Sequence, residues 1–328
     1  MINTENPKTI DGLMRYLRNE KSIQINGSVQ KRELKNNGYY HGYKGYRFYK
    51  KPNNQFQFVD YGQISSIIEF DNDLKALLYP FIMQIETALK NYVLEVIIKN
   101  TQSDKFTDAY SLLTAYNDYP KYSENYRFYM QKRLFIRNKI YSTLSSDFHH
   151  NQIVQHFYSS DRPVPIWAIF ELISFGDFGT FVMCLQKNIR HDISKELNLN
   201  SSYDTKFKLL EDIIFTLKDL RNAVAHNEPI YDVRYSSGKI SQDLKNCLMN
   251  EIGISVTFKA IVDYFILTGY ILNKLQISKP KIYKMLDSFK NSCMIFYRKV
   301  NDGSIYFKIV QTDAFEKLDK MKLYLKNN

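Results

Sequence analysis

The sequence predicts a mainly α-helical fold, and three observations lead to this prediction. Apolar residues recur at helical spacing through two long segments, 74–97 and 203–226. Hydrophobic residues make up 44% of the 328-residue chain, which is enough to build a substantial core. Strand signals are confined to short runs near the two ends. We therefore expect a small N-terminal lobe (1–70), a helical domain (71–278) and a C-terminal accessory segment (279–328).

The N-terminal lobe is expected to begin with two short helices, at 9–19 and 28–36. Ser28 could cap the second helix, and Gly38 could follow its end. The next stretch, 36–51, mixes Gly, Tyr and basic residues, which is typical of a loop with a short strand. Residues 55–61 could pair with that strand.

The first long helix is indicated by the apolar stripe from Leu74 to Ile97. Asp71 or Asp73 could cap its start. Pro80 lies inside the pattern, and because proline removes a helix hydrogen bond we expect it to kink or divide the helix. Residues 101–125 are rich in polar residues and Tyr, so a loop is expected there.

The middle of the chain predicts helices at 126–144 and 150–158. A further helix opens at Pro163 and Pro165, and Gly176 and Gly179 are expected to mark its end.

A second strongly amphipathic helix, 203–226, is stopped by Pro229. Another helix is expected at about 254–276. Farther on, Asn301-Asp302-Gly303 separates two short apolar runs, which predicts a β-hairpin. A basic helix at about 313–326 is expected to close the chain.

The charge balance favours a polyanionic partner. Lys and Arg exceed Asp and Glu by 45 to 34, for a net charge of +11, which suits nucleic acid or an anionic surface but also simple solubility. The three cysteines are far apart, so a disulfide framework does not fit. The first ten residues lack the apolar core of a signal peptide, and no apolar run reaches membrane-spanning length. We therefore expect a cytoplasmic protein with no membrane partner.

Several familiar sites are missing from the sequence. It contains no glycine-rich phosphate loop, no His-Glu-x-x-His and no nucleophile elbow. His149, His150 and His156 lie near one another, but no matching ligands accompany them, so a solvated face is favoured over a metal site. We expect no metal and no cofactor.

The segment Arg221 to His226 remains as a candidate site. RNA carries its own nucleophile, the 2′-hydroxyl, and a His can take or give that proton near neutral pH, while an Arg can hold the phosphate. On an ideal helix Arg221 and His226 are about 140° apart, whereas Asn222 and His226 share a face. The site therefore needs a helix end near His226 or residues from a second copy. The alternative is a helix C-terminus whose His interacts with free carbonyls.

Arg221-Asn222 through His226 resembles the signature of HEPN-domain ribonucleases. More specifically, residues 9–275 resemble the Abi-like (AbiD/AbiF) abortive-infection proteins of bacteria. His41 stands where the family's Tyr-rich element has Arg, so any role of that Arg does not carry over. The segments that carry the resemblance are Asn37–Tyr40 with Gly42 and Tyr43; Phe70–Lys75; Ile85–Lys90; Pro165–Trp167 with Glu171 and Ser174–Gly176; and Arg221–His226.

The resemblance implies a HEPN-type helical bundle and a phage-defence ribonuclease that needs no metal. His226 would be the general acid or base, Arg221 would stabilise the phosphate, and Asn222 would orient His226 or the RNA. Such proteins usually build one cleft from two copies, so a homodimer is implied. Two carboxylates would support the site: Glu171 as a buried partner of Arg221, and Glu86, which could instead only pair with Lys90.

A basic, Tyr-rich segment in the N-terminal lobe could contact RNA, since basic grooves with stacking aromatics hold single strands. These tyrosines could equally pack the lobe. Two other function classes stay open: a non-cleaving RNA-binding protein that forms a complex with a structured small RNA, and a protein-interaction scaffold. The candidate RNA-contacting residues are Tyr39, Tyr40, Tyr43, Lys44, Tyr46, Arg47, Lys50 and Lys51.

Overall fold

The fold is helical throughout the part of the chain that the computed structural model describes, residues 8–199, 202, 204–236, 238 and 240–328. This confirms the mainly α prediction. The elements are α1 (Ile10–Lys21), α2 (Gly27–Asn37), the π-helical turn η1 (Tyr39–Lys44), α3 (Tyr61–Thr101), α4 (Phe106–Ser111), the 3₁₀ turn η2 (Ala115–Asp118), α5 (Glu124–Asp147), α6 (Gln152–Ser159), α7 (Ile166–Leu172), α8 (Phe175–Cys184), α9 (Lys187–Glu196), α10 (Leu209–Ala225), α11 (Gln242–Ile252), α12 (Ile261–Lys274), α13 (Lys279–Val300), α14 (Gly303–Val310) and α15 (Ala314–Asn327).

The axis of the molecule is α3, a helix of 41 residues and hence roughly 60 Å long. It begins earlier than predicted, because Asp60 forms a capping box with Gln63, while Asp71 is buried in mid-helix. Pro80 does not divide the helix. Both Pro80 and Ala76, whose carbonyl loses its helical partner, are exposed, so that carbonyl can bond to water.

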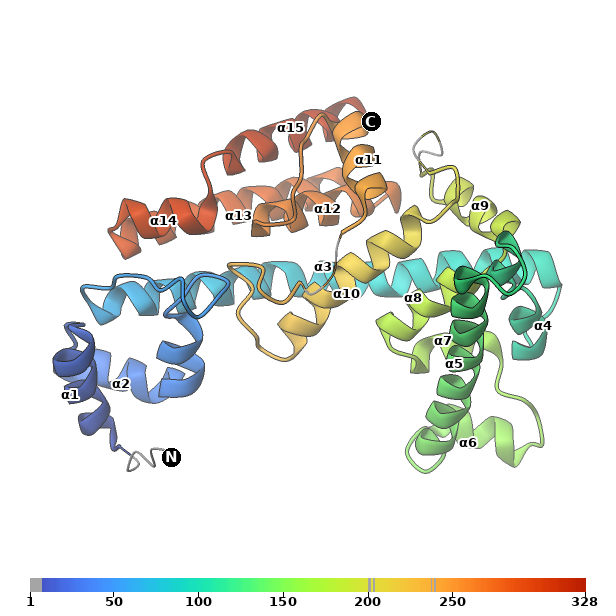
Figure 1. Cartoon of the computed structure of the whole chain (residues 1–328), viewed down its shortest axis with the longest axis horizontal. Helices are drawn as coiled ribbons and strands as arrows, with labels where there is room; N and C mark the ends of the chain where they lie inside the picture. The colour runs from blue at the N-terminus through green and yellow to red at the C-terminus, as the bar shows by residue number, and fades with distance from the viewer. Residues whose placement is uncertain (1–7, 200–201, 203, 237, 239) are drawn as a thin grey trace.

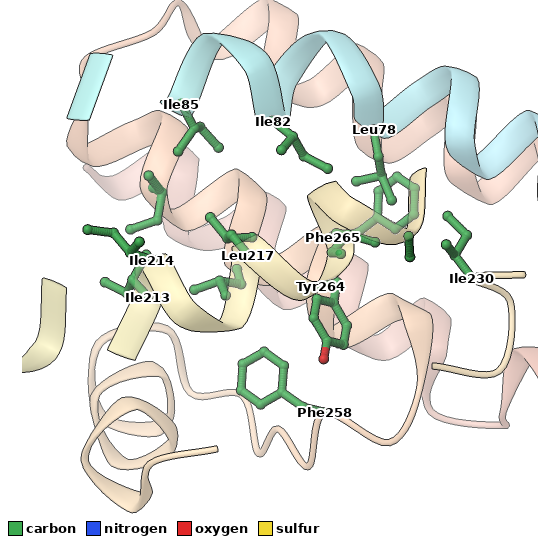
Figure 2. Packing of buried hydrophobic residues seen from close by; sticks show 14 of the residues in the cluster. Leu78, Ile82, Ile85, Ile213, Ile214, Leu217, Ile230, Phe258, Tyr264 and Phe265 are labelled. Carbon is green, nitrogen blue, oxygen red and sulfur yellow. The ribbon is translucent and has the colours of Figure 1, made fainter. Parts of the chain in front are cut away.

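The core forms where other helices pack along α3 (Figure 1). In that view α12, α13 and α15 cover one side of α3, and α10 crosses its middle. Figure 2 shows apolar side chains of α3, α10 and α12 meeting in a continuous buried layer, with Phe258 at its edge. The labelled members are Leu78, Ile82, Ile85, Ile213, Ile214, Leu217, Ile230, Phe258, Tyr264 and Phe265.

The N-terminal lobe, at the left in Figure 1, contains α1, α2 and η1. The strand predicted within 36–51 is reduced to a single antiparallel bridge between Phe48 and Gln55, because residues 39–44 wind into η1. α2 begins after Asn26 rather than at Ser28, and Gly38 ends it as predicted, with a positive φ of 70°.

The other end of α3 carries α4 to α9. The predicted helix end at Gly176 and Gly179 is wrong, since both lie inside α8, which Ser174 caps. A Cβ on Gly179 would lie 2.9 Å from the Ile214 side chain. Glycine is therefore there to let α8 approach α10 closely.

The predicted C-terminal β-hairpin is also wrong, and the chain forms two helices there instead. Asn301 ends α13 in the left-handed region (φ 46°), and Asp302 caps α14 by accepting a hydrogen bond from the Ile305 N–H at 3.1 Å. The turn-forming triplet is thus a helix stop followed by a helix start. In the run before Asn301, the buried residues Cys293, Phe296 and Val300 are three and four positions apart, as they must be to share one face of a helix.

Among the described residues, no helix combines the length and apolar character that a membrane span requires.

Candidate functional site

The candidate site lies where α10 ends. His226 is the C-cap, and Asn227 follows it in the left-handed conformation, with φ 54°. The Glu228 N–H donates to the Ala223 carbonyl at 2.8 Å, and the Asn227 N–H to the Val224 carbonyl at 3.2 Å. This Schellman ending satisfies the last carbonyls of the helix through the backbone. The His226 ring is therefore not needed to cap the helix.

The three predicted catalytic residues differ in their exposure. Asn222 and His226 are exposed, and because they are four residues apart they share one face of α10. Arg221 is half-buried on another side of the helix, and its side chain is 29% exposed. The fold thus presents the amide and the imidazole together to solvent, with the guanidinium beside the core.

Arg221 is held by a buried carboxylate on α3. Its Nε lies 3.2 Å from Glu86 Oε2, and Glu86 Oε1 accepts from Lys90 Nζ at 3.1 Å. Lys90 also donates to the Ile173 carbonyl, at the junction of α7 and α8. A buried carboxylate between two cations is an anchor whose loss leaves a charge unpaired. It fixes the stem of Arg221 and, among described residues, leaves the terminal amino groups without another protein partner.

Of the two predicted supporting carboxylates, Glu86 occupies the position next to Arg221. Glu171 does not: it is exposed on α7, and among the described residues the carboxylate that pairs with Arg221 is Glu86. Glu86 makes both of the contacts that the sequence offers as alternatives, one with Lys90 and one with Arg221.

The segment that follows His226 is tied to α3 by a second buried cluster. Asp71 Oδ1 accepts from the backbone N–H groups of Ile230 and Tyr231, each at 2.7 Å. Lys75 bridges the cluster, because its Nζ lies 2.8 Å from Asp71 and donates to Asn227 Oδ1 at 2.9 Å. Burial raises the pKa of the Asp71 carboxyl, and Lys75 opposes that shift. These bonds fix the chain immediately after the catalytic candidates.

The N-terminal lobe reaches the same region. Arg234 donates from Nη1 to the Gly45 carbonyl at 2.7 Å and from Nη2 to the Phe48 carbonyl at 2.8 Å, while Asp232 holds its Nε at 2.8 Å. Tyr46 donates to Asp71 at 2.7 Å. The Tyr-rich segment is thus fastened beside the chain that leaves α10.

That segment turns different residues inward and outward. The rings of Tyr43 and Tyr46 are buried, at 3% and 5% exposure, which leaves no open face for a base. Tyr49, which was not among the candidates, is buried too. Tyr40 is 73% exposed, and Lys44 and Lys51 are also exposed. The remaining candidates, Tyr39, Arg47 and Lys50, are intermediate.

Sequence reasoning missed the Asp71–Lys75–Asn227 cluster and the Asp232–Arg234 pair. A signal for the first was present. Asp71 and Lys75 fall within the apolar stripe of α3, where Leu74, Leu78 and Ile82 are buried. A charge at core spacing needs a buried partner, so such a position points to a network. No pattern in the sequence indicates which residue that partner is.

Across the described residues, no group of three or more His, Cys, Asp or Glu side chains is placed to hold a metal ion. The site therefore has an exposed His226 imidazole and an exposed Asn222 amide, and the Arg221 guanidinium is held by Glu86. These are groups that bind phosphate and move protons.

The architecture is thus a helical protein with a polar cluster at one helix end. A family model described as "Abi-like protein" matches residues 32–232. The match covers more than half of the chain, and the chain belongs to the Abi-like family. The matched region includes the buried charged residues of α3, the junction of α7 and α8, and the Arg221–His226 segment. No curated protein and no solved structure matches.

Proposed function

We propose that this protein is a metal-independent endoribonuclease of the HEPN type that acts in abortive infection, a form of phage defence. The observation that carries the proposal is the arrangement at the end of α10, where Glu86 holds Arg221 and where Asn222 and His226 are exposed. Membership of the Abi-like family supports the phage-defence role.

The proposed reaction is transfer of the phosphate within the RNA strand. His226 takes the proton from a 2′-hydroxyl, and the bond from O2′ to phosphorus forms as the bond to the 5′-oxygen breaks. The leaving 5′-oxygen receives a proton from water. Arg221 offsets the charge that develops on the phosphate. The products are a 2′,3′-cyclic phosphate and a 5′-hydroxyl, and no metal takes part in the scheme.

Two copies are proposed to form the working site. Within one chain, Arg221 lies about 140° from His226 around the helix. A two-fold pairing that brings two α10 ends together would set the Arg221 of one chain beside the His226 of its partner.

The test is to incubate the purified protein with mixed RNAs in chelator and to identify the new ends. We expect 2′,3′-cyclic phosphates, and His226→Ala is expected to abolish cleavage with an unchanged melting temperature, because the side chain is exposed. Strict magnesium dependence with 3′-hydroxyl ends would rule out the mechanism.

A second candidate function is RNA binding without cleavage, in a complex with a structured small RNA. It is favoured by the net charge of +11 and by the exposed Tyr40, Lys44 and Lys51 on the N-terminal lobe. Tight, salt-sensitive binding that survives in His226→Ala, with no cleavage by the wild type, would support this function over the first.

A further inference from the structure

A positively charged pocket lies at the start of α10, at the other end of this helix from the candidate nuclease site. It has a volume of about 340 Å³ and opens between η2, the start of α9 and the segment that precedes α10. Four of its six lining residues are cationic and one is a carboxylate, so the formal charge of the lining is +3. The lining residues are Asp118, Tyr119, Lys187, Arg190, Lys206 and Lys208.

Arg190 is the fixed centre of this pocket. Its side chain is only 2% exposed, and its Nη2 donates to Asp118 Oδ2. Its Nε and Nη1 find no hydrogen-bond partner among the described residues. A buried N–H without a hydrogen-bond partner is destabilising, and more so on a charged group. Both nitrogen atoms are themselves buried, so Arg190 contributes a fixed positive charge at the pocket wall rather than exposed N–H groups, and such a charge attracts anionic oxygens.

Lys208 is the second anchored cation. Its Nζ donates to the hydroxyls of Tyr119, at 3.1 Å, and Tyr129. Burial opposes the charge on Lys208, but the hydrogen bonds with Tyr129 and Tyr119 and the nearby Glu211 carboxyl together raise its pKa. The ammonium is therefore both charged and held in place.

The positive charges of the pocket also act on Tyr119 at its wall. Burial alone would raise the pKa of Tyr119, yet the hydrogen bonds with Tyr129 and Lys208 and the charges of Lys208 and Lys206 lower it. Lys187 and Lys206 are exposed, so they can swing toward a ligand. Asp118 already engages Arg190, which leaves the other cations without a carboxylate from the pocket lining.

We propose that this pocket binds the phosphoryl group of a nucleotide-sized ligand. Two anchored cations and two mobile lysines match a group with several anionic oxygens, and the volume lies in the range of small-molecule sites. The pocket is separate from the candidate nuclease site, because Lys208 precedes α10 and His226 follows it. The rise of the helix places them roughly 27 Å apart. The proposal does not depend on ribonuclease activity.

The experiment measures binding by calorimetry and thermal shift on the full chain, with inorganic pyrophosphate and ATP as probes at constant ionic strength. We expect saturable binding of one ligand per chain and a rise in melting temperature. The variant Lys187→Ala/Lys206→Ala is expected to bind at least tenfold more weakly. A control with the same charge loss, Lys195→Ala/Lys281→Ala, changes exposed lysines outside the pocket and should bind as the wild type does.

A third probe distinguishes a free ligand from an RNA end, using short RNAs with a 5′-phosphate or a 5′-hydroxyl in the His226→Ala background. A preference for the 5′-phosphate that the pocket variant loses would assign the phosphoryl group to RNA. The proposal is overturned if no probe binds saturably at millimolar concentration. It is also overturned if both double variants lose binding equally, since that result shows only an effect of net charge.

Discussion

At the scale of single residues, the α3 face that meets α10 carries charges where a core would normally be apolar. Lys75, Glu86 and Lys90 are each less than 10% exposed. Each has a partner, and the partners of two of them lie at the end of α10. Because an unpaired buried charge is expensive, these pairs place the end of α10 at one position along α3.

Glu86→Gln is expected to lower RNA cleavage at least tenfold. The amide cannot neutralise both Arg221 and Lys90, so the guanidinium loses its fixed position, and a misplaced catalytic group can cost about 10²-fold in rate. The measurement is the single-turnover cleavage rate together with the melting temperature.

Glu171→Gln provides the control, since it is the same carboxylate-to-amide change on an exposed residue. It should leave both quantities unchanged. Equal rates for the two variants would show that Glu86 does not position Arg221.

A pH dependence is expected from Glu211, which is buried in the first turn of α10. Burial raises the pKa of its carboxyl from 4.5 to about 7. Between these values the folded chain keeps a proton that the unfolded chain has lost. The free energy of unfolding therefore falls as pH rises through this window, by up to about 3 kcal/mol for a shift of this size.

Glu211→Gln removes this titration. We expect the variant to be more stable than the wild type at pH 8, by about 1–3 kcal/mol, with the difference shrinking toward zero at pH 5. Urea unfolding at both pH values provides the measurement. A gain that is the same at both values would show that Glu211 is not the titrating group. Asp212, whose pKa burial raises to about 6, titrates in both proteins.

At the scale of elements, the contact of α8 with α10 depends on Gly179. Gly179→Ala would bring a methyl group to 2.9 Å from Ile214 and 3.2 Å from Phe215. We expect a loss of about 1–3 kcal/mol in the free energy of unfolding, as for other overpacked cores. The helical Gly12 provides the comparison, because a Cβ there meets nothing closer than 3.5 Å, and Gly12→Ala should stabilise slightly.

The two elements that the sequence predicted best are the ones whose apolar spacing is long. The stripes of α3 and α10 run over several turns, and a helix is the only structure that buries such a stripe on one side. Short apolar runs carry no such information. The runs on either side of Asn301 fit a strand or a helix equally, and the pairing of α13 with α3 decided between them.

The candidate site, too, could be predicted from the sequence only in part. Arg221, Asn222 and His226 are neighbours in the sequence, so their pattern was visible before the fold was known. The contact of Arg221 with Glu86 joins residues 135 positions apart. The sequence offered Glu86 and Glu171 for supporting roles, and only the packing of α7 showed that Glu171 faces solvent. Likewise, no local pattern distinguishes the buried Tyr43 from the exposed Tyr40.

At the scale of the whole molecule, the end of α10 lies on the open side of α3. In Figure 1 the N-terminal lobe and the α5–α6 arm extend from either end of α3 on one side, with α10 ending between them. The opposite side is covered by α12, α13 and α15. Asn222 and His226 are exposed at this end of α10, so they are accessible to a second copy.

Mixing two inactive variants is the direct test of a shared site. Arg221→Ala and His226→Ala chains are each expected to be inactive alone, because each lacks one group that the scheme requires. In a mixed dimer, a composite site can take Arg221 from one chain and His226 from the other. Cleavage should return to a fraction of the wild-type rate after the two proteins are unfolded together and refolded, and it should rise with total concentration.

The outcome depends on how the groups are distributed between the chains. If one chain supplied all its own catalytic groups, the mixture would stay as inactive as its components. Full activity of a wild-type protein that stays monomeric in sedimentation would exclude the dimer altogether. Neither Arg221→Ala nor His226→Ala should recover activity when it is refolded alone. Recovery in the mixture then requires that Arg221 of one chain and His226 of the other act on the same RNA strand. Within one chain, the two residues lie about 140° apart around α10.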